Sequence, residues 1–280
     1  MAAIPTTALP SGETVPVLGQ GTWQMGERLG AKSDEVRALR VGLDLGMSLI
    51  DTAEMYADGG AEQVVREAVR GRRDEVFLVS KVYPQNASFE GAQRACERSL
   101  GRLGTDRIDL YLLHWRGHHP LAETVRAFVE LQAAGKIRHW GVSNLDTDEL
   151  EELWLVADGS SCATDQVLFN VGRRGPEHDL LPWCGARGVP VMAYSPLEQG
   201  RLDAGTVLDE IGAAHGVDRY AVALAWVLNR PGIVAIPKAT RPAHVEANAR
   251  AVAITLTADE LAAIDTAFPP PATKRPLAVL

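Results

Sequence analysis

Short apolar runs alternate with longer helical patterns through most of the sequence, and this alternation limits the possible folds more than any other feature. Apolar runs that predict strands lie at residues 47–50, 76–80, 108–113, 139–142, 163–168, 189–193 and 233–236. Helices are predicted at residues 33–45, 61–70, 89–103, 121–134, 147–155, 180–187, 206–215, 220–228 and 258–268. Such alternation indicates parallel strands joined by right-handed crossovers. Because the runs are apolar throughout, both faces of the sheet are expected to be buried.

The N-terminal segment supplies the further strand that would close such a sheet. Residues 8–23 predict a hairpin around a Ser11-Gly12 turn, and an eighth parallel strand is expected near residues 17–23 or within the hairpin. Eight strands close a (β/α)8 barrel, whose usual length of about 250 residues suits this chain. An open, doubly wound sheet is the alternative. Since no linker or change in composition divides the sequence, we predict an α/β protein in which residues 1–280 form a single (β/α)8 TIM barrel domain with an N-terminal β-hairpin.

Charge and cysteine content exclude several classes of protein. The net charge of −8 argues against a nucleic-acid partner and against an anionic membrane surface. Cys96, Cys162 and Cys184 form no CxxC pair, so neither a disulfide framework nor a zinc site is indicated. No signal peptide is expected, and no apolar run reaches the roughly 18 residues of a membrane span. We expect a soluble, cytoplasmic, monomeric protein that holds no metal.

Polar residues close three successive predicted strands. These residues are Asp51, Lys81 and His114, and Tyr56 follows shortly after the first of them. The carboxyl ends of parallel barrel strands meet at one mouth, where active sites lie. A single polar residue at a strand end is more often a solvated cap, whereas three in succession with complementary acid–base chemistry favour a functional site.

Seven motifs in a fixed order, spread over nearly the whole chain, give a resemblance to the aldo-keto reductase family. The motifs are GQGTW at 19–23, IDTAEMY at 50–56, VSK at 79–81, LYLLHW at 110–115, GVSN at 141–144, AYSPL at 193–197 and IPK at 236–238. Each motif lies at a predicted strand end. Within the family, the chain is most similar to small bacterial NADPH-dependent reductases of methylglyoxal and other 2-oxoaldehydes.

The resemblance implies reduction of an aldehyde or ketone to an alcohol by hydride transfer. Tyr56 would be the general acid, because a carbonyl that accepts hydride needs a proton on its oxygen. Lys81 would lower the pKa of this phenol, Asp51 would hold the lysine, and His114 would orient the carbonyl. Taken singly, the same residues could be a rim tyrosine, a buried ion pair and a core histidine bonded to a backbone carbonyl.

The cofactor implied by the resemblance is NADPH, although no Rossmann fingerprint is present, because Gln24 occupies the place of its third glycine. Tyr194 would stack on the nicotinamide. Lys238 and Arg241 would face the 2′-phosphate, which favours NADPH over NADH. The other implied contacts are Thr22, Trp23, Asp51, Ser143, Asn144, Gln166, Ser195, Leu197, Gly200, Ala239, Thr240, His244 and Asn248.

Three positions of this segment depart from many relatives. Ala239, His244 and Ala247 stand where serine, arginine and glutamate are common in the family. An imidazole stacks on adenine less strongly than a guanidinium does, so modest or pH-dependent cofactor affinity is expected.

Substrate specificity is expected to lie in three loops, at residues 55–60, 115–120 and 269–280. Trp23 and Trp115 are candidate walls of a pocket for a small carbonyl compound, together with Tyr56 and His114. The short tail predicts an open pocket. The sequence Arg116-Gly117-His118-His119 departs from the continuation seen in many relatives, and its adjacent histidines lack the spacing of a metal site.

Two other functions compete with catalysis. One is a barrel that binds NADPH without turnover, as a sensor or a subunit. The other is a metal-dependent hydrolase, which usually has an HxH pair after an early strand, where this chain has Asp51-Thr52-Ala53-Glu54. A pure binding protein would not need the proton donor Tyr56, and this favours the reductase.

Overall fold

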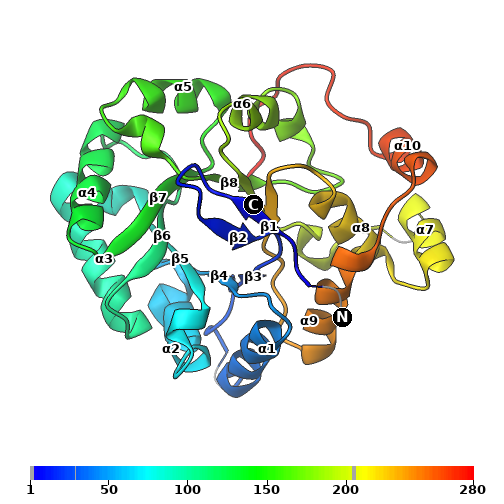
Figure 1. Ribbon diagram of the computed structural model, residues 1–280, viewed down its shortest axis with the longest axis horizontal. Coiled ribbons are helices and arrows are strands. Elements are labelled where there is room, and N and C mark those ends of the chain that lie inside the picture. The colour runs from blue at the N-terminus through cyan, green and yellow to red at the C-terminus, as the bar shows by residue number, and fades with distance from the viewer. Residues whose placement is uncertain (1–2, 29, 204–205) are drawn as a thin grey trace.

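The computed structural model describes residues 3–28, 30–203 and 206–280, and in these residues eight parallel strands surround a common axis (Figure 1). The strands are β3 (Gln20–Gly21), β4 (Leu49–Asp51), β5 (Phe77–Val82), β6 (Ile108–Leu113), β7 (Ile137–Ser143), β8 (Asp165–Leu168), β9 (Val191–Tyr194) and β10 (Ile233–Ala235). Each strand pairs in parallel with the next one along the chain. The predicted strands are therefore confirmed, and the eighth lies near residues 17–23.

The sheet closes on itself between its first and last strands. Parallel bridges join Leu18 to Ala235 and Gly21 to Lys238. The amide of Gly19 donates to the carbonyl of Ala235, and the amide of Ala235 donates to the carbonyl of Val17, both over 2.8 Å. These bonds confirm the predicted (β/α)8 barrel and exclude the open sheet. The expected domain, 1–280, also includes residues 1–2, 29 and 204–205, which lie outside the described part.

Helices form the outer ring of the barrel (Figure 1). They are α1 (Lys32–Asp44), α2 (Gly60–Ala68), α3 (Phe89–Leu103), α4 (Leu121–Ala133), α5 (Thr147–Leu155), α6 (Leu180–Ala186), α7 (Val207–His215), α8 (Arg219–Leu228), α9 (Pro242–Arg250) and α10 (Ala258–Ala267). Nine of them lie within a few residues of the predicted ranges. None of those described is long and apolar enough to cross a membrane.

Helix α9 is the element that the apolar pattern did not predict. Its buried residues are Val245, Asn248 and Ala249, so its inner face carries one large apolar side chain. The helix begins at Pro242, because proline suits the first helical turn, where the missing N–H would have no partner.

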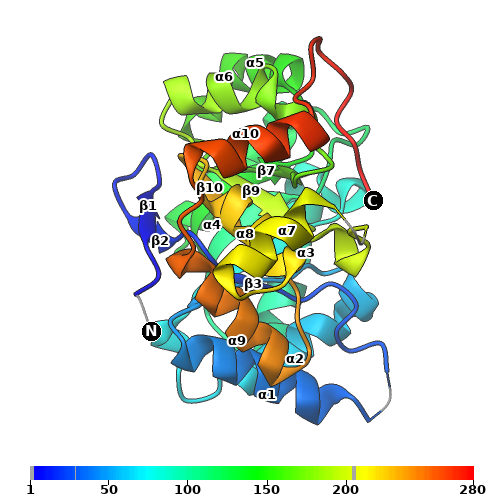
Figure 2. The ribbon, with the colours of Figure 1, turned by 90° about the vertical axis from the view of Figure 1, so that its right-hand side faces the viewer.

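The interior of the barrel is an apolar cluster that the N-terminal hairpin closes at one end. Strands β1 (Thr6–Ala8) and β2 (Thr14–Pro16) pair in antiparallel fashion, which confirms the predicted hairpin. The cluster contains Leu9, Val15, Leu49, Phe77, Val79, Leu110, Leu112, Ala163, Met192, Val234 and Ile236. Figure 2 shows the hairpin and the C-terminus at opposite ends of the molecule. The hairpin therefore covers the floor of the barrel and leaves the other end free.

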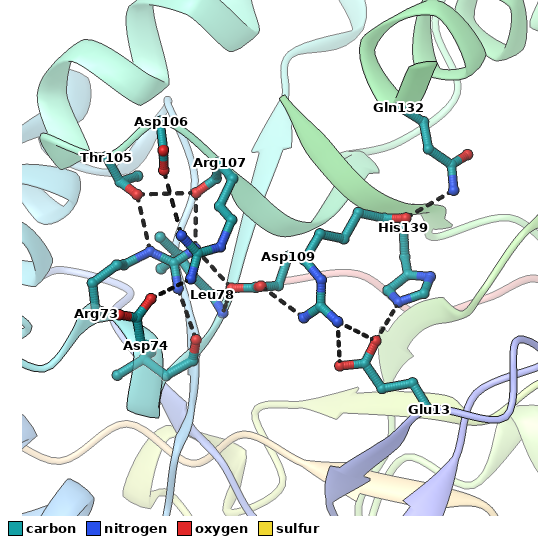
Figure 3. A network of polar contacts seen from close by, with 12 residues as sticks. Glu13, Arg73, Asp74, Leu78, Thr105, Asp106, Arg107, Asp109, Gln132 and His139 are labelled. Atoms are coloured by element: carbon teal, nitrogen blue, oxygen red, sulfur yellow. Dashed lines mark hydrogen bonds and ion pairs between the residues drawn. The ribbon is translucent and has the colours of Figure 1, made fainter. Parts of the chain in front are cut away.

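A chain of charged side chains fixes the hairpin to this floor (Figure 3). The Glu13 carboxylate accepts hydrogen bonds from Arg138 over 2.7 and 2.8 Å, and its Oε2 lies 2.7 Å from Nε2 of His139. Arg138 also donates to Asp109 over 3.0 Å, and Asp109 accepts from Arg73 over 2.7 Å. The network thus joins the hairpin to the starts of β5, β6 and β7.

Candidate active site

The alternation of side chains along each strand places polar residues at the mouth of the barrel, next to the apolar interior. Successive side chains of a strand point to opposite faces, so residues two apart share a face. The interior cluster contains Leu49, Val79 and Leu112. Two positions further on lie Asp51, Lys81 and His114. The same pattern that fills the barrel therefore aims these three polar side chains at the end of the barrel away from the hairpin.

Lys81 is completely buried at this end and is held by four oxygen atoms. Its Nζ donates to both carboxylate oxygens of Asp51 over 2.8 Å and to the carbonyl of Thr52 over 2.9 Å. The Tyr56 hydroxyl lies 3.3 Å from the same nitrogen. A desolvated ammonium needs this degree of pairing, because an unpaired buried charge is strongly destabilising. The structure brings the predicted proton donor and lysine together.

Tyr56 lies in a short turn, Tyr56–Gly59, that follows β4 and precedes α2. Its ring packs edge-on against Trp23, with ring centroids 5.0 Å apart, and against His114, at 5.8 Å. The rings of Trp23 and His114 and the Lys81 ammonium therefore all contact the phenol.

The electrostatic environment corrects one expectation about Tyr56. Burial, and then the carboxylate of Asp51, raise the pKa of Tyr56 well above its usual range, whereas we predicted that Lys81 would lower it. The prediction was wrong mainly because the phenol is buried, which disfavours its charged form, and because the Asp51 carboxylate contacts the Lys81 ammonium at 2.8 Å and offsets part of its charge. A phenol is already protonated at neutral pH at its ordinary pKa of about 10, so the raised pKa of Tyr56 keeps the proton in place but does not make the phenol a stronger acid.

His114 is neutral in this environment. Burial, with Lys81 nearby, holds the pKa of His114 well below its usual range. Its Nδ1 is buried and has no hydrogen-bond partner among the described residues. This nitrogen is thus not bonded to a backbone carbonyl, as the reading of His114 as an ordinary core histidine required.

A line of hydrogen bonds connects Asp51 to the far wall of the mouth. The Gln166 amide donates to Asp51 over 2.8 Å, and Ser143 donates to the carbonyl of Gln166 over 2.7 Å. The Asn144 amide donates to the Ser143 hydroxyl over 3.0 Å and accepts from the Tyr194 hydroxyl over 3.0 Å. The predicted nicotinamide contacts on β7, β8 and β9 are therefore one connected unit with the predicted catalytic residues.

A cavity of about 1090 Å³ opens above these residues. It is lined by every predicted catalytic and binding residue except Lys81, which lies behind Tyr56 and Asp51. The predicted residues in its wall are Thr22, Trp23, Asp51, Tyr56, His114, Trp115, Ser143, Asn144, Gln166, Tyr194, Ser195, Leu197, Gly200, Lys238, Ala239, Thr240, Arg241, His244 and Asn248. A site of this size is at the upper end of those that take small molecules and cofactors, roughly 300–1,000 Å³.

The residues present fit a dinucleotide with an extra phosphate. Lys238 and Arg241 have no ion pair among the described residues and line one wall of the cavity. Ser195 and Gly200 have positive φ angles of 46° and 78°, so the backbone turns sharply where it lines the cavity. His114 also lines the cavity, and its buried Nδ1 has no hydrogen-bond partner among the described residues. In the described part of the chain, no group of three or more His, Cys, Asp or Glu side chains could hold a metal ion.

Several wall residues were not predicted as site residues by number. They include Gln24, Glu149, Gln199, Asp218 and Tyr220, whereas the wall residues Arg116, Val279 and Leu280 lie in loops that were expected to determine substrate specificity. No motif marks Glu149 or Tyr220, which reach the cavity from helices α5 and α8. Their placement depends on tertiary packing that local sequence does not express.

The C-terminal tail, one of the three segments expected to determine substrate specificity, reaches the cavity. The last residues of the tail, Val279 and Leu280, form part of the cavity wall. Lys274 fixes this tail to the barrel, because its ammonium lies 2.7 Å from Asp148 and 3.4 Å from Asp179. Figure 2 shows the tail returning to the end of the barrel opposite the hairpin.

A closed parallel barrel with a tyrosine, lysine, aspartate and histidine at its carboxyl mouth defines a class of barrel oxidoreductases. Residues 17–268 match the sequence profile of the aldo/keto reductase family. The chain belongs to this family, and the alternative of a barrel that only binds its cofactor is not supported.

Relatives agree with this assignment over almost the whole chain. Methylglyoxal reductase YeaE of Escherichia coli (strain K12) is 55% identical over 269 residues, which cover 94% of this chain and 95% of the relative. Glyoxal reductase of Bacillus subtilis (strain 168) is 32% identical, with 93% and 91% covered. An aldo-keto reductase of Klebsiella pneumoniae, solved in complex with NADPH, has a TM-score of 0.96 at 51% identity, with 100% of both chains covered.

Proposed function

We propose that this protein reduces small carbonyl compounds with NADPH and uses Tyr56 as the proton donor. The observation that carries the proposal is the Tyr56 hydroxyl, 3.3 Å from the buried Lys81 ammonium, in the wall of a dinucleotide-sized cavity. NADPH would supply the hydride when bound, and it is the cofactor of the solved relative from Klebsiella pneumoniae.

The protein's own residues would complete the reduction at the carbonyl oxygen. As the carbonyl carbon accepts hydride, its oxygen gains negative charge, and Tyr56 donates its proton there to give the alcohol. Lys81 would stabilise the phenolate that remains, and Asp51 would keep the lysine in place. Neutral His114 would orient the carbonyl oxygen by a hydrogen bond.

The cofactor would lie along the wall that runs from β7 to the segment after β10. Tyr194, Ser143, Asn144 and Gln166 would hold the nicotinamide end, and the backbone near Ser195 and Gly200 would face the pyrophosphate. The remaining predicted contacts, Thr22, Trp23, Leu197, Ala239, Thr240, His244 and Asn248, line the same cavity. Lys238 and Arg241 would pair with the 2′-phosphate, which gives a preference for NADPH.

The substrate class that we propose is 2-oxoaldehydes such as methylglyoxal, in keeping with the relatives named methylglyoxal reductase and glyoxal reductase. Trp23 and Trp115 are 39% and 37% exposed and give the pocket apolar walls. We further propose that residues 1–280 act as one domain and as a cytoplasmic monomer. The net charge of −8 and the three free cysteines support an intracellular protein that does not bind nucleic acid.

NADPH absorbance, followed with a panel of aldehydes, 2-oxoaldehydes and simple ketones, tests the proposal. We expect oxidation of NADPH that depends on the carbonyl compound, with the highest kcat/KM for 2-oxoaldehydes. No oxidation with any member of the panel, in a protein that binds NADPH, would contradict the proposed activity. A higher kcat/KM for simple aldehydes would contradict the substrate class alone.

A further inference from the structure

Arg116 is a charged residue of the cavity wall to which the proposed reaction assigns no task. It follows His114 and Trp115 after β6, and all three line the cavity. In the closed ring, β6 lies four strands from β10 in either direction, so Arg116 enters the mouth from the side opposite to Lys238 and Arg241. Arg116 therefore belongs to the substrate side and not to the phosphate side.

The backbone that carries Arg116 is held in place. A side chain at Gly117 would come within 2.7 Å of the ring of Pro84, so the two loops are in close contact. The His119 ring nitrogen Nε2 lies 3.3 Å from the carbonyl of Gln85. The loop after β6 is thus packed against the loop after β5, which fixes the base of the arginine side chain.

The guanidinium of Arg116 is already paired with a carboxylate of the protein itself. Glu152 of α5 accepts from Nη1 and Nη2 of Arg116 over 2.6 and 2.8 Å. This two-point geometry is the one in which arginine binds the carboxylate of a ligand. Glu149 and Asp146 at the start of α5 add further negative charge beside Arg116. Arg116 thus lines the cavity with its guanidinium already paired to Glu152, and of the three carboxylates Glu149 also lines the cavity.

We infer that Glu152 determines substrate specificity by occupying Arg116, so that the pocket favours uncharged carbonyl compounds and rejects aldehydes that carry a carboxylate. The inference rests on the proposed reductase function and refines its substrate class. An anionic substrate would have to displace Glu152 and approach Glu149 and Asp146. A neutral 2-oxoaldehyde would neither need to displace Glu152 nor be repelled by Glu149 and Asp146.

The Arg116–Glu152 pair is open to such competition. The side chains are 30% and 54% exposed, and partly exposed pairs of this kind are weak and easily exchanged. Loss of the Glu152 charge would leave a two-point donor free in the substrate pocket. A carboxylated aldehyde could then bind Arg116 in the way that Glu152 now does.

The test compares butanal with 4-oxobutanoate, which offers a similar short aldehyde and adds a carboxylate. The ratio of their kcat/KM values is measured for the unmodified protein, Glu152→Gln, Glu151→Gln and the double variant Arg116→Gln/Glu152→Gln. Glu151 is exposed on the same helix, so Glu151→Gln removes an equal charge without freeing Arg116. We expect Glu152→Gln to raise the ratio of 4-oxobutanoate to butanal about tenfold.

Two controls separate local pairing from a general change in charge. Glu151→Gln should keep the ratio of the unmodified protein, and the double variant should return to it. An equal rise in Glu151→Gln and Glu152→Gln, or a rise that persists in the double variant, would overturn the inference. Either result would assign the selectivity to the overall field of α5.

Binding of butyrate by calorimetry gives a second readout that needs no turnover. We expect tighter binding to Glu152→Gln than to the unmodified protein, and loss of this gain in the double variant. Equal affinity in all forms would overturn the role of Glu152. Failure of the protein to reduce butanal would instead contradict the proposed reductase, while the butyrate result would still decide the role of Glu152.

Discussion

Lys81 is the residue on which the geometry of the mouth most depends. Its ammonium is fully buried, and its hydrogen bonds join β4, β5 and the Tyr56 turn at one point. Such a group is tolerated only with close partners, so Asp51 is required for the fold of the site as much as for its chemistry. The sequence motifs predicted that these residues meet. The direction of the pKa shift on Tyr56 depends instead on burial and on the Asp51–Lys81 distance, which no motif contains.

Lys238 provides a test of the cofactor assignment that is independent of catalysis. Lys238→Ala is expected to weaken NADPH binding by about tenfold or more and to change NADH binding little, because only NADPH carries the 2′-phosphate. Fluorescence titration with both cofactors measures the two dissociation constants. Lys136→Ala, at the floor end just before β7, is the matched control and should alter neither. Equal losses for both cofactors would place the phosphate elsewhere.

Strand β8 has a residue of the site on one face and a buried carboxyl group on the other. Gln166 points into the barrel and bonds Asp51, while its neighbour Asp165 is fully buried on the other face. Its carboxyl oxygens accept no well-formed hydrogen bond from the described residues, although the backbone of Leu145 and Gln166 is close enough to favour the charged form. Burial, with Glu149 and Asp146 nearby, raises the pKa of Asp165 well above its usual range. The sequence predicted the strand and its Gln166, but it gave no sign of this buried carboxyl.

The raised pKa of Asp165 predicts that stability depends on pH. Its folded-state pKa is raised, so its contribution is full below the unfolded pKa of about 3.9 and is lost as the pH rises toward the folded value. Asp165→Asn should therefore gain stability relative to the unmodified protein as the pH rises above about 4, by up to about 1.4 kcal/mol per pH unit.

Urea unfolding at pH 5 and pH 8 measures this difference. Glu151→Gln, an exposed carboxyl, is the control and should show no such divergence. A difference between Asp165→Asn and the unmodified protein that stays constant with pH would show that Asp165 ionises normally in the folded state.

In the molecule as a whole, the network that fixes the hairpin and the residues of the candidate active site lie at opposite ends of the barrel axis. The hairpin and the Glu13–Arg138–Asp109 network close the floor (Figure 3), while the polar ends of the strands and the tail surround the cavity at the mouth. Periodicity predicted the ring of strands, because short, fully apolar runs that alternate with helices are typical of parallel strands buried on both faces. It missed α9, whose inner face is weakly apolar.

Single-turnover reduction by Tyr56→Phe, with NADPH already bound, is the most direct test of the central claim. The variant keeps the ring that packs against Trp23 and His114 and removes only the hydroxyl beside Lys81. We predict an NADPH dissociation constant within about twofold of the unmodified protein and a reduction rate lower by about 100- to 10,000-fold. A rate close to that of the unmodified protein, with NADPH binding intact, would contradict the account.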